Sequence, residues 1–141
     1  MKKRNAVKSA AVLLSAFVCA VFALFLVHSP VFFGGRGYEL YAGASSSACI
    51  LETENPACDK ILLGGVSGES VRYDGNRVSE LLRRYRAKVL FTEEAGGVIN
   101  YYCYSPLLGK GIGLYGATVN FHVAAGEKQT AAGTPIIFGG F

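Results

Sequence analysis

The chain has 141 residues, of which 51% are hydrophobic and 17% are charged, and its formal net charge is +4. This length predicts a single domain. The excess charge is confined to one end, because residues 1–8 carry four Lys or Arg, whereas residues 34–141 carry ten Lys or Arg and ten Asp or Glu. The part after the N-terminal segment is therefore formally neutral, which argues against a nucleic-acid partner.

An apolar run from Ala10 to Val27 follows the basic start of the chain. As a helix its 18 residues would span about 27 Å, close to the hydrocarbon core of about 30 Å. The basic flank predicts that residues 1–8 stay in the cytoplasm. We therefore expect a single-pass signal anchor over residues 9–33, with the membrane as its partner. The alternative is a secretory signal that is cleaved to release the rest of the chain.

The next segment, residues 34–47, is rich in glycine and small residues and is interpreted as a linker. Within it, Tyr38 to Tyr41 is either a short strand or part of that linker. An extracytoplasmic domain is expected over residues 48–141. Its first two apolar runs, Ala48 to Thr53 and Lys60 to Val66, flank an Asn-Pro turn signal and are predicted to form a hairpin.

One amphipathic helix is predicted between Asn76 and Arg86. Its apolar positions recur at helical spacing, with Asn76 as the capping residue; they are Val78, Leu81, Leu82 and Tyr85. Arg83 and Arg84 occupy the last turn, where positive charge complements the helix dipole. Two interpretations of these arginines stay open: a solvated helix face, or a surface that binds anionic lipid headgroups or a wall polymer.

Four strands are predicted after this helix, from alternating apolar residues, tyrosines and flanking glycines; they cover residues 87–93, 98–105, 117–124 and 130–138. One helix packed on an antiparallel sheet is an α+β fold. In the second strand, alternation places Tyr102 and Tyr104 on one face and Tyr101 with Cys103 on the other. We interpret Tyr102 and Tyr104 as a candidate partner surface.

The cysteines favour a disulfide over a metal site. Cys49 and Cys58 are separated by the predicted turn, and the compartment outside the membrane permits their pairing. Cys103 would then be unpaired and buried. The cysteines and His122 lack the short paired spacing of zinc ligands, so neither a metal nor a cofactor is predicted.

Catalysis is the less favoured interpretation. Gly68-Glu69-Ser70 resembles half of a nucleophile elbow, but the second glycine is missing. A hydrolase would need Ser70 or Ser105 to meet His122 and an acid in space. The alternative is that His122 is a structural histidine, and we predict no catalytic residues.

From Gly68 onward, the order of segments resembles the C-terminal part of the YwmB-like proteins, a family of exported proteins of Gram-positive bacteria with no known biochemical role. The resemblance covers roughly residues 62–141 and rests on the predicted helix and five short segments: residues 68–71, 87–94, 101–106, 119–123 and 133–137. It implies an α+β domain with a helix against an antiparallel sheet, and it supplies no catalytic residues. The family's label, TATA-box-binding-like, refers to fold and implies no DNA binding.

The sequence thus favours a membrane-anchored extracytoplasmic domain, not an enzyme, that binds a protein or a cell-envelope component. Two alternatives stay open. One is an envelope hydrolase that uses Ser70 or Ser105 with His122. The other is a structural or assembly factor in envelope maintenance or sporulation.

Overall fold

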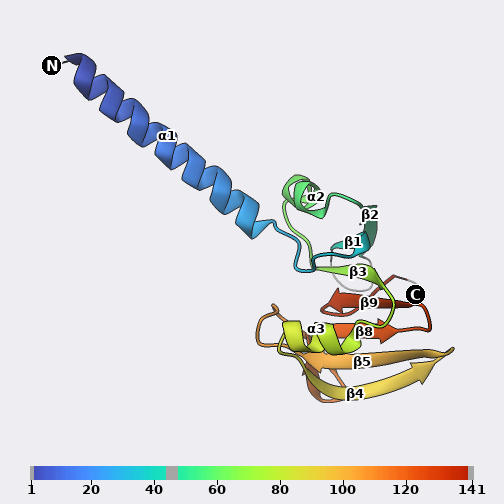
Figure 1. Ribbon diagram of the computed structural model, residues 1–141. Helices are drawn as coiled ribbons and strands as arrows, with labels where there is room; N and C mark the ends of the chain where they lie inside the picture. Colours follow the sequence, from blue (N-terminus) through green and yellow to red (C-terminus); the bar gives the residue numbers. More distant parts are fainter. Residues whose placement is uncertain (1, 44–47, 140–141) are drawn as a thin grey trace.

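A computed structural model describes residues 2–43 and 48–139. A long N-terminal helix projects away from a compact domain (Figure 1). The helices are α1 (Lys2–Val27), α2 (Pro56–Leu63) and α3 (Val78–Arg84). The strands are β1 (Arg36–Ala42), β2 (Cys49–Thr53), β3 (Gly68–Asp74), β4 (Lys88–Ala95), β5 (Val98–Tyr104), β6 (Ile112–Leu114), β7 (Ala117–Val119), β8 (Phe121–Ala125) and β9 (Gln129–Thr134).

The domain is built on a seven-stranded sheet in the order β2-β1-β3-β9-β8-β5-β4. All of its neighbouring strands pair antiparallel. The hairpin β6-β7 forms a separate two-stranded sheet. Helix α3 lies against one face of the large sheet (Figure 1), which we call the inner face; the opposite face is the outer face. The predicted α+β class is confirmed.

The core lies between α3 and the inner face. Val78 and Leu81 of α3 and Tyr85, which follows the helix, are buried there against sheet residues such as Val71 and Phe121. These three residues belong to the predicted apolar stripe, so the helical periodicity is confirmed. The helix begins one residue later than expected. Asn76 lies before the capping position, and its Oδ1 accepts a hydrogen bond from the Val78 amide at 3.1 Å.

The expected linker is wrong over residues 36–42, which form β1 and pair with both β2 and β3. Of the two interpretations of Tyr38 to Tyr41, the strand is correct, and Leu40 and Tyr41 are fully buried. The remaining linker residues 44–47 lie outside the described residues. A strand with so many small neighbours shows little hydrophobic alternation, which explains why sequence patterning left it undecided.

The predicted hairpin of Ala48–Thr53 with Lys60–Val66 is also wrong. The first run does form β2, but its partner is β1, and residues 56–63 form α2. Pro56 stands in the first turn of α2, where its missing amide hydrogen costs nothing and its fixed φ suits a helix. The Asn-Pro pair therefore starts a helix here and is not a hairpin turn.

Two other predicted strands differ from the observed ones. The run over residues 117–124 is interrupted at Asn120, which separates β7 from β8. The last strand ends at Thr134, and the tail formed by residues 135–139 folds over the outer face. This tail lies so close to Gly133 that a Cβ there would stand 2.7 Å from Ile137 Cγ1. Gly133 therefore lets the tail approach the sheet.

Candidate functional site

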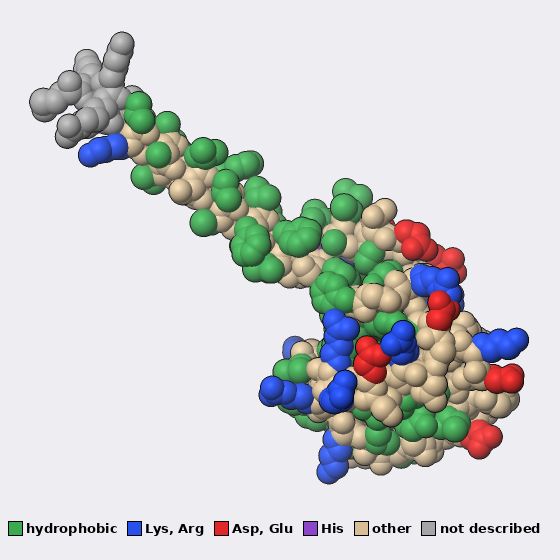
Figure 2. Space-filling view, in the orientation of Figure 1, with side chains coloured by type: hydrophobic (Ala, Val, Ile, Leu, Met, Phe, Trp, Pro, Cys, Tyr) green, Lys and Arg blue, Asp and Glu red, His purple; other side chains and the backbone are tan. Residues whose placement is uncertain are grey.

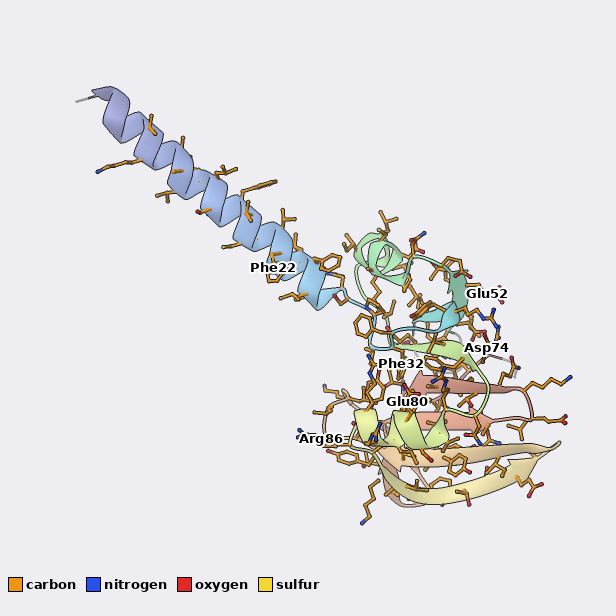
Figure 3. All side chains as sticks on the ribbon, in the orientation of Figure 1. Phe22, Phe32, Glu52, Asp74, Glu80 and Arg86 are labelled. Atoms are coloured by element: carbon orange, nitrogen blue, oxygen red, sulfur yellow. The ribbon has the colours of Figure 1, made fainter. Side chains whose placement is uncertain are left out.

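Helix α1 contains one segment that is long and apolar enough to cross a membrane. Val7–Val27 has 21 residues, a mean hydropathy of 2.8 and no burial against the domain. At about 1.5 Å per residue the segment is about 32 Å long, which matches a bilayer core of about 30 Å. Its apolar side chains point outward along its whole length (Figure 3). This helix could therefore anchor the chain in a membrane.

The junction between α1 and the domain is part of the domain core. Phe32 follows Val27 by only a few residues, yet its side chain is 0% exposed. Its ring meets Tyr85 edge-on at 5.3 Å and stacks on Phe121 at 5.9 Å. The Tyr85 hydroxyl donates to the Val31 carbonyl at 2.9 Å. These contacts fix the domain close to the end of α1, without a flexible spacer.

A buried ion pair ties the junction to α2 and β3. Glu69 Oε1 accepts hydrogen bonds from the amides of Val31 at 2.5 Å and Phe32 at 3.1 Å. Glu69 Oε2 pairs with Lys60 Nζ, and both side chains are almost fully buried. Lys60 Nζ also donates to the Ser29 carbonyl at 3.1 Å. One carboxylate and one ammonium thus connect three segments that are distant in sequence.

Aromatic rings form a continuous stack across the outer face, which we call the ring stack: Tyr115, Phe91, Tyr102 and His122. Tyr115 meets Phe91 edge-on at 5.4 Å, Phe91 stacks on Tyr102 at 4.6 Å, and Tyr102 stacks on His122 at 4.5 Å. Burial raises the pKa of Tyr102 above its usual value. The exposed end of the stack is Tyr115, which is 85% exposed.

The predicted alternation along β5 is correct. Cys103 is fully buried on the inner face and Tyr101 packs against the same core. Tyr102 and Tyr104 face outward, and Tyr104 is 44% exposed. Sequence analysis missed Phe91 and Tyr115 as members of this surface. An aromatic residue in the glycine-rich segment 109–116 was the one available signal, because such a segment has little capacity to bury a large ring.

His122 is held by hydrogen bonds at both ring nitrogens. Nε2 lies 3.0 Å from Asn100 Oδ1, and Nδ1 accepts from the Ile137 amide at 3.2 Å. Because Nδ1 is the acceptor, Nε2 carries the proton and donates to Asn100. Burial lowers the pKa of His122 to about 4. The neutral ring therefore fastens the tail to the outer face.

The geometry gives no support to the hydrolase interpretation. Ser70 and His122 share a row of the outer face but both pair with Gly133 of β9, which lies between them. Two strand spacings separate them by about 10 Å, far beyond a hydrogen bond. Ser70 Oγ instead donates to Glu39 at 3.1 Å. Ser105 is fully buried, and its Oγ donates to the Tyr85 carbonyl at 2.5 Å.

The predicted disulfide is not formed. Cys49 and Cys58 are both free and exposed, because Cys58 belongs to α2 and not to a strand opposite Cys49. Cys103 is free and buried as expected, and burial raises its pKa to about 12. Across residues 2–43 and 48–139, no group of three or more His, Cys, Asp or Glu is placed to hold a metal ion.

Arg83 and Arg84 lie on the opposite side of the sheet from Tyr102 and Tyr104, so the two predicted partner surfaces do not merge. Both arginines are exposed at the end of α3. No ion pair among the described residues involves either of them. Arg84 borders a cavity of about 530 Å³ beside the junction.

The chain matches no known protein-family model, no curated protein and no solved structure.

Proposed function

We propose that this chain is a membrane-anchored extracytoplasmic domain that binds a protein or a cell-envelope component and catalyses no reaction. In this proposal α1 spans the membrane with residues 1–8 in the cytoplasm, because the cationic flank of a span favours the cytoplasmic side. The YwmB-like resemblance adds to the proposal that the domain is exported. The ring stack on the outer face is the proposed binding surface.

The observation that carries the proposal is the conformation of Tyr115. Tyr115 and Gly116 connect β6 to β7, with φ of 50° and 79°. Positive φ at both central residues is the requirement of a type I′ turn, which strongly favours Asn-Gly. A bulky side chain at positive φ is strained. Folding alone would therefore favour Asn over Tyr at this position.

The exposure of Tyr115 points to the same conclusion. At 85% exposure it contributes little buried area to the fold, and its ring contact is with Phe91. Exposed aromatic rings with a fixed orientation bury much area on a partner at a small entropic cost. Residues that cost stability without serving packing are commonly retained for function. The ring stack thus supports recognition by contact with an apolar or planar partner group.

The test places a photo-crosslinking phenylalanine derivative at Tyr115 in the full chain, expressed in its host membrane. A matched control places it at Ile50, which is 40% exposed on β2. We expect a discrete adduct from position 115, absent from position 50 and weakened by Phe91→Ala. The same adducts from both positions, or none from position 115, would overturn the proposed surface.

A stability comparison completes the test. Tyr115→Asn should leave the free energy of unfolding unchanged or slightly higher, because Asn suits the turn. The same variant should no longer co-purify with the partner that the crosslinker at position 115 identifies. A variant that unfolds more easily but still binds would show that Tyr115 serves the fold.

A further inference from the structure

The exposed and buried sides of α2 are the reverse of those in an ordinary surface helix. Pro56 and Lys60 are its buried residues. Its exposed residues include Ile61 at 48%, Leu62 at 82% and Leu63 at 40%. A helix in contact with water normally turns its apolar stripe inward and its charged residues outward. This apolar turn is therefore suited to a surrounding less polar than water.

The position of α2 identifies that surrounding. Figure 1 shows α2 beside the domain end of α1, and the Lys60–Ser29 hydrogen bond joins the two segments directly. Phe32 holds the domain against the same junction. When α1 spans a bilayer, its end at Val27 lies at the level of the lipid headgroups. The short junction then keeps Ile61, Leu62 and Leu63 near that level.

On the other side of the junction lies a cavity that combines apolar walls with one basic side chain. The cavity of about 530 Å³ is bordered by Leu26 and Val27 of α1 and by Phe33, Arg84 and Leu107 of the domain. Phe33 is 48% exposed and Leu107 is 56% exposed. Its walls are thus apolar where they meet α1, and Arg84 places a guanidinium beside them. A phospholipid matches this arrangement, because its acyl chain is apolar like the walls and its anionic phosphate complements the guanidinium.

The charges of the domain are also unevenly distributed. Figure 2 shows mostly Lys and Arg side chains along the left edge of the domain, below the end of α1, whereas the right edge carries Asp and Glu together with further basic side chains. Arg83 and Arg84 end α3, whereas Glu93 and Glu94 lie at the far end of β4. A formally neutral domain can therefore still be attracted to an anionic surface at the end where its basic residues gather.

We propose that these residues seat the domain on the anionic phospholipid leaflet from which α1 emerges. We call them the juxtamembrane collar: Phe33, Ile61, Leu62, Leu63, Arg84 and Leu107. The turn of α2 enters the boundary between headgroups and acyl chains, about 5–10 Å deep. Arg84 binds a lipid phosphate through its planar guanidinium. The inference rests on the proposed membrane anchor and leaves the ring stack free for a partner.

The test exploits the absence of tryptophan from the chain. Single-tryptophan variants of the full chain are reconstituted into vesicles of phosphatidylcholine and phosphatidylglycerol with brominated acyl chains, which quench nearby indoles. Leu62→Trp is the reporter and Ile99→Trp is the control, since Ile99 is 40% exposed near the far end of β5. We expect a blue-shifted emission and several-fold stronger quenching at position 62 than at position 99.

Phe22→Trp, within α1, separates the two proposals. If position 22 is quenched and position 62 is as exposed to water as position 99, the collar is overturned while the anchor stands. If position 22 is not quenched, the anchor itself fails. Arg84→Glu in the Leu62→Trp background should reduce quenching, and replacing phosphatidylglycerol by phosphatidylcholine should do the same. Quenching that neither change alters would overturn the role of Arg84.

Discussion

Replacement of Glu69 by Leu should strongly destabilise the domain. It leaves the Lys60 ammonium buried without its counter-charge, since that side chain is only 8% exposed. Breaking a buried ion pair in this way costs about 3–5 kcal/mol. The Val31 and Phe32 amides also lose their common acceptor, at about 1–3 kcal/mol for each amide that stays buried and unpaired. The free energy of unfolding of a domain is usually about 5–15 kcal/mol, so Glu69→Leu removes much of it.

The companion variants separate charge from hydrogen bonding. Lys60→Met leaves a buried carboxylate that still accepts hydrogen bonds from two amides. The loss of unfolding free energy should therefore lie near the lower end of the range for a broken buried ion pair, at about 3 kcal/mol. The double variant Lys60→Met/Glu69→Leu buries no unpaired charge. It should therefore be more stable than Glu69→Leu alone, with a coupling free energy of about 0.5–3 kcal/mol.

The assay is denaturant unfolding of the full chain in detergent micelles, and the alkylation of Cys103 measures the unfolded fraction. This thiol is fully buried in the folded domain and becomes reactive when the core opens. The exposed pair Arg77–Glu80 supplies the matched control, with about half of each side chain accessible. Replacing Glu80 by Leu should cost less than about 1 kcal/mol. A double variant at 60 and 69 whose loss equals the sum of the single losses would refute the reasoning.

Other predictions concern the junction, the tail and the core thiol. Phe32→Ala should cost about 3–5 kcal/mol in the same unfolding assay and leave the helical circular dichroism of α1 unchanged. Burial lowers the pKa of His122 to about 4 from 6.5, so the unfolded chain binds more protons between these values. Stability should therefore fall by about 2–3 kcal/mol as the pH drops from 6.5 to 4, and His122→Asn should flatten that profile. Gly133→Ala places a Cβ 2.7 Å from Ile137 Cγ1, so hydrogen exchange at the Ile137 amide should accelerate, whereas a control Gly109→Ala should not change it. In the folded chain Cys103 should resist iodoacetamide while Cys49 and Cys58 react; a linked Cys49–Cys58 peptide would contradict the last expectation.

Helical periodicity and strand alternation predicted the parts of the fold whose residues divide cleanly between core and surface. The stripe on α3 and the faces of β5 are of this kind, and both are found as expected. Helix α2 could not be predicted in the same way, because its buried residues are a proline and a lysine. Strand β3 begins with Gly, Glu and Ser, all of them buried. Those positions depend on partners distant in sequence, which no local pattern contains.

The candidate sites show the same limit. Tyr102 and Tyr104 were found by alternation, whereas the ring stack that includes Tyr102 depends on Phe91 from another strand and Tyr115 from a separate hairpin. The Glu69–Lys60 pair joins β3 to α2 only after both have folded. Sequence could name Ser70, Ser105 and His122 as a candidate set, but only the sheet register shows that a strand separates two of them.

The folded junction should also resist proteolysis between α1 and the domain. The chain from His28 to Val31 is half-buried, and a protease needs such a segment extended and free. Here Lys60 holds the Ser29 carbonyl and Glu69 holds the Val31 amide. If α1 spans a membrane, cleavage after it would therefore compete with folding in time, and a chain that folds first would keep its helix. The contacts that stabilise the core then also determine how long the protein remains attached to α1.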